Sequence, residues 1–104
     1  MLVCTTWKAR PLSPEQSERM MAVWGKTEAK EAEGSSAERL CWYINADGSG
    51  GVTVSRVADA ESAISLMLET SLALGEFIEL DSRIVMDLDA AMGPITNAME
   101  LISA

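Results

Sequence analysis

Histidine is absent from this chain of 104 residues, and cysteine occurs only twice. Without histidine, neither a Ser-His-Asp nor a Cys-His catalytic arrangement can form. Histidine is the commonest axial ligand of haem iron and a usual ligand of zinc, so its absence argues against both kinds of site. Because the carboxylates also lack EF-hand spacing, we expect no metal site and no cofactor.

Basic residues are also few, since eight Lys and Arg stand against sixteen Asp and Glu. The net charge is −8 and the basic residues are scattered, whereas phosphate binding needs them clustered. Nucleic acid and membranes are therefore not expected partners. No apolar run approaches the roughly 18 residues that cross a bilayer, and the start, MLVCTTWK, lacks the pattern of a signal peptide. These absences predict a cytoplasmic protein.

The remaining composition, 48% apolar and 23% charged, predicts one folded domain over residues 1–104. Its centre is RLCWYINADGSGGVTVSRVAD, at 39–59, which predicts a hairpin of strands 39–45 and 52–57. Gly and Asp at 47–51 supply the positive φ angles of a tight turn. One register places Ile44 opposite Val52 and Trp42 opposite Val54. The other face then carries Cys41, Tyr43, Asn45, Thr53 and Ser55.

A strand over residues 2–8 and a helix precede the hairpin. Ser13 can cap this helix, Pro14 suits its first position, and Gln16 completes a capping box. The helix fades into a loop at 31–36. Its apolar stripe, which we expect in the core, contains Met20, Val23, Trp24 and Thr27.

A second helix follows the hairpin, capped by Asp59 and ended by Gly75. Its predicted stripe is Ile64, Met67, Leu68, Ser71 and Leu72. Residues 77–88 then alternate with period two, which predicts a strand, kinked or bulged at Ser82. Pro94 opens a last helix that ends at Ser103. The stripe of that helix is Ile95, Met99 and Ile102, with Ala98 alongside.

This β-α-β-β-α-β order with an added C-terminal helix predicts an α+β, ferredoxin-like fold with a four-stranded antiparallel sheet. In that order the third strand separates the first strand from the second. Cys4 and Cys41 would then stand too far apart for a disulfide, so we expect two reduced, unlinked thiols.

Three features of the chain resemble the dimeric α+β barrel proteins, in which two such sheets face each other. They are an opening strand that ends in Trp7-Lys8, an aromatic residue before Asp47-Gly48-Ser49, and an acidic cap after the third strand. Within that group the chain resembles a small bacterial domain family of unknown function. The wider group includes antibiotic-biosynthesis monooxygenases, haem-degrading enzymes and muconolactone-isomerase-like enzymes. The resemblance implies a homodimer.

If the apolar side of each strand lies under the helices, the opposite face gathers polar and aromatic side chains that suit a pocket. This face is a dimer interface that encloses a cleft, an interface alone, or a face wetted by solvent. The register of the first strand leaves open whether Trp7 belongs to the set. The candidate ligand-binding residues are Trp7, Tyr43, Asn45, Ser55, Glu79 and Arg83.

Two classes of function fit these residues. The first is a homodimeric binding or accessory module that holds a small, mostly apolar molecule without turnover. The alternative is a cofactor-independent enzyme of the monooxygenase or isomerase kind, acting on a small apolar or aromatic substrate. In that enzyme Tyr43, Asn45 and Arg83 orient an enolate and Glu79 moves a proton. The absence of a catalytic motif favours the first class.

Overall fold

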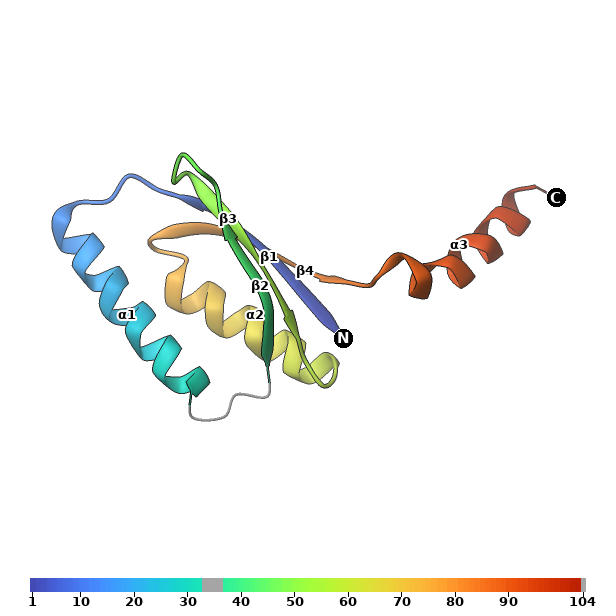
Figure 1. Cartoon of the computed structure of the whole chain (residues 1–104), viewed down its shortest axis with the longest axis horizontal. Helices are drawn as coiled ribbons and strands as arrows, with labels where there is room; N and C mark the ends of the chain where they lie inside the picture. Colours follow the sequence, from blue (N-terminus) through green and yellow to red (C-terminus); the bar gives the residue numbers. More distant parts are fainter. Residues whose placement is uncertain (33–36, 104) are drawn as a thin grey trace.

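The structure is a computed structural model that describes residues 1–32 and 37–103. Within them, the chain forms strands and helices in the predicted β-α-β-β-α-β order, followed by one more helix (Figure 1). The elements are β1 (Leu2–Ala9), α1 (Pro14–Ala32), β2 (Glu38–Ile44), β3 (Gly50–Arg56), α2 (Ala60–Leu74), β4 (Ile78–Val85) and α3 (Leu88–Ile102). The α+β class and the ferredoxin-like order are confirmed.

The four strands form one antiparallel sheet in the order β2-β3-β1-β4. Helices α1 and α2 lie on the same side of this sheet (Figure 1). We call that side the covered face and the other side the open face. As predicted, β3 separates Cys4 on β1 from Cys41 on β2, and both thiols are free. Two strand spacings amount to about 9.6 Å, beyond the reach of a disulfide.

The helix starts are confirmed at the level of single hydrogen bonds. The Gln16 N–H donates to Ser13 Oγ at 3.1 Å, and the Ser13 N–H donates to Gln16 Oε1 at 2.9 Å. Asp59 Oδ1 accepts from the Ser62 N–H at 2.8 Å and caps α2. Of the loop predicted at 31–36, the first two residues belong to α1, and 33–36 lie outside the described residues.

The predicted stripe of α2 is correct at Met67, which packs against the core, but it is otherwise rotated by about one residue. Ile64, Leu68 and Leu72 are exposed, whereas Ala63 is fully buried against Val3 and Val57. The helix is apolar around much of its circumference, so periodicity alone does not choose the buried side. The side that carries Ala63 is buried, because this small side chain lets the helix approach the sheet closely.

The predicted hairpin register is also wrong. Tyr43 pairs with Val52, Trp42 with Thr53 and Ile44 with Gly51, because β3 begins at Gly50 rather than at Val52. A bulge between Arg39 and Cys41 places Arg39 on the same face as Trp42, three residues later. As a result, Thr53 and Ser55 lie on the covered face, and Val52 and Val54 lie on the open face.

Strand β4 pairs with β1 without a register shift, so the kink or bulge expected at Ser82 is absent from this pairing. The serine that interrupts the apolar side of β4 shares a hydrogen bond of 2.8 Å with the Thr5 hydroxyl on β1. The interruption is therefore a polar cross-strand pair on the covered face.

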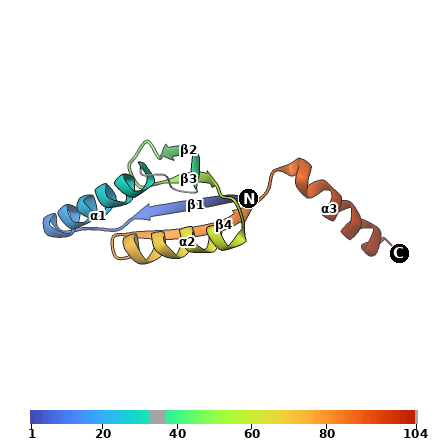
Figure 2. The same ribbon diagram turned by 90° about the horizontal axis from the view of Figure 1, so that it is seen from below.

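Helix α3 begins at Leu88, six residues before the predicted start, and Pro94 lies in its interior. Asp87 Oδ1 caps it by accepting from the Ala90 N–H at 2.9 Å. Among the described residues, α3 contacts no other helix or strand, and it projects beyond the body of the molecule (Figures 1 and 2). The radius of gyration is accordingly 16.8 Å, against about 13 Å for a compact chain of this length.

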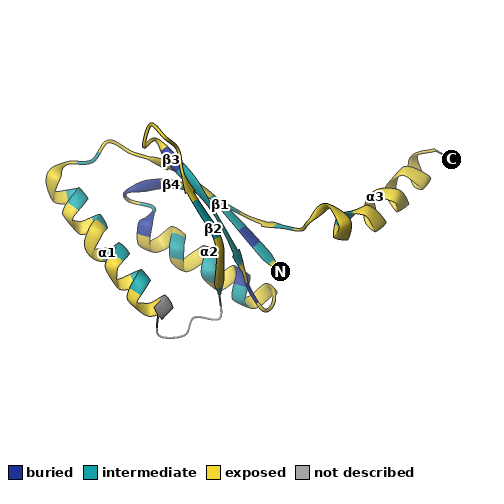
Figure 3. Ribbon diagram, in the orientation of Figure 1, coloured by how far each residue is buried: buried dark blue, intermediate teal, exposed yellow. Residues whose placement is uncertain are grey.

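The buried core under the helices is divided into two clusters. One joins Val3, Val57 and Ala63, and the other joins Leu74, Phe77 and Ile78. Figure 3 shows how few residues are buried and that α3 is exposed along nearly all of its length. A cleft adjoins both clusters, since Val3 of one and Leu74 and Ile78 of the other line it.

Candidate ligand-binding cleft

The six candidate residues do not come together. Tyr43, Glu79 and Arg83 lie on the open face, but Tyr43 is on edge strand β2 and the other two are on the opposite edge, β4. Three strand spacings, about 14 Å, separate those edges. Asn45 lies in the hairpin turn, where its Nδ2 donates to Ser49 Oγ.

Glu79 and Arg83 also lack the environment of a catalytic pair. Both are exposed, and Arg83 donates to Asp81, two residues back on the same strand, at 3.1 Å. These hydrogen bonds to Asp81 raise the pKa of Arg83 above its ordinary value. The arrangement assigned to an enolate in the enzyme alternative is therefore not assembled on this chain.

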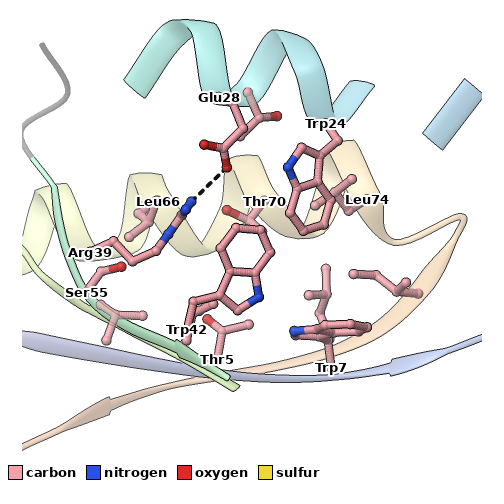
Figure 4. Close-up of a pocket in the computed structure, with 15 residues that line it drawn as sticks. Thr5, Trp7, Trp24, Glu28, Arg39, Trp42, Ser55, Leu66, Thr70 and Leu74 are labelled. Carbon is pink, nitrogen blue, oxygen red and sulfur yellow. Dashed lines mark hydrogen bonds and ion pairs between the residues drawn. The ribbon is translucent and has the colours of Figure 1, made fainter. Parts of the chain in front are cut away.

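The other two candidates, Trp7 and Ser55, lie on the covered face and line a cleft between the sheet and the two helices (Figure 4). Its cavity has a volume of about 90 Å³. All three tryptophans of the chain line it, one each from β1, α1 and β2. The walls are completed by Val3, Thr5, Thr27, Glu28, Arg39, Thr53, Leu66, Thr70, Leu74, Ile78 and Leu80.

Stacked side chains form the wall nearest the edge strand β2. The rings of Trp24 and Trp42 stack with centroids 4.8 Å apart. The guanidinium carbon of Arg39 lies 4.5 Å from the centroid of Trp42, a cation–π contact. Arg39 also pairs with Glu28 on α1 at 3.0 Å (Figure 4). This ion pair and the tryptophan stack both tie α1 to β2 across the cleft.

One polar atom in the cleft has no partner. The indole Nε1 of Trp42 is buried and has no hydrogen-bond acceptor among the described residues. An indole N–H is a donor only, and a buried donor without an acceptor costs about 1–3 kcal/mol. A ligand with an acceptor oxygen would recover that cost after a small side-chain shift that opens Nε1 to the cavity, since protein atoms cover it now.

Sequence reasoning missed most of this site. Trp24 was expected in the core, but it is half-buried and lines the cleft. Trp42 was expected under the helices, which is confirmed, although without a role. One signal was present in the sequence: three of the five aromatic residues are tryptophans, which bring both an apolar surface and a donor.

No family model matches this chain, and no curated protein matches it. In the described part of the chain, no helix is long and apolar enough to cross a membrane. Residues 1–32 and 37–103 contain no group of three or more His, Cys, Asp or Glu side chains that could hold a metal ion.

Proposed function

We propose that this protein is a homodimeric small-molecule-binding module that holds its ligand in the cleft without turnover. The observation that carries the proposal is the unpartnered Nε1 of Trp42 inside a tryptophan-lined cavity. Apolar walls with a few polar groups that fix orientation are typical of ligand sites.

The cavity restricts the ligand. A volume of about 90 Å³ is smaller than the roughly 150 Å³ that accommodates benzene. We therefore expect one end of a small, flat molecule to enter, with a carbonyl or carboxylate oxygen accepting from Trp42 Nε1. The rest of the ligand lies at the cleft mouth, where Arg39 and Glu28 are only partly exposed.

Trp42→Phe tests this proposal, because it keeps an aromatic ring and removes the N–H. We would screen small aromatic acids, amides and ketones against the wild type by ligand-observed NMR. Hits should bind the variant at least tenfold more weakly, as expected for a lost buried hydrogen bond. Tyr43→Ala is the matched control, since Tyr43 is 68% exposed on the open face and should leave affinity unchanged.

If Trp42→Phe binds the hits as tightly as the wild type does, Nε1 does not contribute to binding. Failure of the wild type to bind any compound of this kind would reject the ligand class. The positive signature is a downfield shift of the Trp42 indole proton with a hit that exceeds the shift caused by the same ring without its acceptor oxygen, because the difference excludes the ring-current effect.

The dimer part of the proposal rests on the open face. Leu2, Val52, Val54 and Val85 lie there, each only partly exposed, and neither α1 nor α2 covers them. A contiguous apolar surface of this kind is typical of an interaction site. Light scattering at micromolar concentration should therefore give twice the 11.2 kDa of one chain. A mass of 11.2 kDa would reject the dimer while leaving the cleft proposal intact.

A further inference from the structure

Helix α3 carries a second uncovered apolar surface. Its large apolar side chains follow one another at spacings of four, three, four and three residues, which is the seam of a helix that packs against a partner. The side chains are between 42% and 83% exposed. We call them the α3 stripe: Leu88, Met92, Ile95, Met99 and Ile102.

This helix needs a partner in order to be stable. Isolated helices of about 12–15 residues are marginal in water, and α3 has 15. Its interior contains Gly93 and Pro94, which cost about 1 and about 3 kcal/mol relative to alanine. Nothing among the described residues packs on α3 to offset these costs.

The open face has the shape to receive such a helix. Its apolar side chains run along the central strands β3 and β1 and onto β2, and include Leu2, Cys4, Val52 and Val54. The far edge, β4, carries Glu79, Asp81 and Arg83. A helix is about 10 Å wide and can cover the apolar strip without covering the charges at its edge. The sheet of a second copy, placed face to face, would bury those charges.

The length of α3 also fits the open face. Fifteen helical residues span about 22 Å, and the seven residues of β3 span about 23 Å. The exposed ionisable residues of α3 are Asp89 and Glu100, both acidic. On the open face, Lys8 stands directly opposite Glu79, and Arg83 pairs with Asp81, so charges of both signs lie there.

We propose that α3 of one copy lies across the open face of a second copy, whose α3 covers the first in return. The inference rests on the homodimer proposed above and specifies how it forms. A two-fold exchange buries two helices and two open faces at once. Four surfaces of roughly 220 Å² each approach the area of about 1,000 Å² that a specific interface needs.

A second surface competes with the open face for helix α3, which we call the arm: the outer surface of α2. It exposes Ile64, Leu68 and Leu72, a stripe of only three residues. Glu61 lies on the same helix, and Glu69 pairs with Lys30 on α1 at 3.5 Å, so charge does not separate the two positions. The open face offers the longer apolar surface.

The first test compares two substitutions that add one negative charge each to α3. Ile95→Glu places it in the middle of the α3 stripe, and Asn97→Glu places it on the polar side of the helix. By light scattering, the wild type and Asn97→Glu should be dimers, and Ile95→Glu should be monomeric, with a dissociation constant at least 30-fold higher. Because α3 stands apart from the body, neither change should alter the melting of the monomer.

A second test identifies the receiving surface by complementation. Val54→Glu, in the centre of the open face, should also be monomeric; Val52→Glu serves in its place if that variant does not fold. A one-to-one mixture of Ile95→Glu with the open-face variant retains one intact helix–face pair. Native mass spectrometry should therefore detect a heterodimer that neither variant forms alone, while Leu68→Glu should remain a dimer.

Each other outcome overturns a specific statement. A monomeric wild type rejects the homodimer and, with it, the exchange. A dimer that survives Ile95→Glu keeps the homodimer and rejects α3 as its arm. Dissociation by Leu68→Glu but not by Val54→Glu moves the arm to α2. If both variants dissociate the dimer without complementing each other, the arm does not bind the open face of the second copy.

Discussion

Trp42 on β2 stacks on Trp24 on α1, with ring planes inclined by 22°. The contact spans the mouth of the cleft and joins the edge of the sheet to the helix that covers it. Elsewhere α1 is held by Met20 and Val23, which pack near Leu74 and Phe77 at the other end of the cleft. The stack, together with the Arg39–Glu28 ion pair, therefore holds α1 against β2.

Trp24→Leu should lower the free energy of unfolding by about 1–2 kcal/mol, because a stacked aromatic pair and part of its buried area are lost. It should also weaken binding of any cleft ligand. Met21→Leu is the matched control on the same helix, since Met21 is exposed, and should change stability by less than about 0.5 kcal/mol. Urea unfolding of both variants measures the difference, and equal effects would show that the stack contributes nothing.

Gly51 accounts for the misplaced hairpin register. Glycines at 50 and 51 were assigned to the turn, since glycine favours turns. In the structure they belong to β3, and a Cβ at Gly51 would lie 2.9 Å from the ring of Trp7. The turn needs its positive φ only at Gly48, where φ is 75°. Sequence patterns identify glycine but do not tell a turn from the close approach of a neighbouring ring.

Gly51→Ala should therefore destabilise the protein by about 2 kcal/mol or more, because the new methyl also meets the backbone carbonyl of Tyr43. Gly25→Ala is the opposite case. Gly25 lies inside α1 with nothing within 4 Å of its Cβ position, so alanine should stabilise by about 0.5–1 kcal/mol. Thermal melting of the two variants should move in opposite directions. A shift of the same sign in both would contradict this account.

The elements were predictable where the signal was local. Capping by Ser13 and Asp59 and the alternation of β4 depend on neighbouring residues, and all three were identified correctly. The ligand set was not, because it depends on the bulge before Cys41 and on the register of β3, which moved Ser55 to the covered face. A shift of one residue turns every side chain of a strand to the other face.

Asp59 should give the protein an acid-sensitive contribution to stability. The hydrogen bond from the Ser62 backbone N–H lowers the pKa of Asp59 below its ordinary value of 3.8. A folded-state pKa below the unfolded value stabilises fully above about pH 4 and is lost as pH falls through the folded pKa. Asp59→Asn keeps a capping oxygen but does not titrate. Between pH 7 and pH 2, wild-type stability should fall more steeply below pH 4, and parallel urea-unfolding curves would contradict this.

Substituting the interior glycine and proline of α3 should make the helix more stable while leaving the side chains of the α3 stripe unchanged. Gly93→Ala with Pro94→Ala removes helix-breaking residues that lie away from the α3 stripe, and restores an N–H that can donate to the Ala90 carbonyl. If docking must also fold the helix, the dissociation constant of the dimer should fall at least tenfold, a fraction of the roughly 4 kcal/mol available. Asn97→Ala, a smaller gain in helix propensity on the polar side, should lower it no more than about threefold. Sedimentation of serial dilutions measures all three. Greater helicity by circular dichroism with an unchanged dissociation constant would mean that α3 takes no part in holding the two copies together.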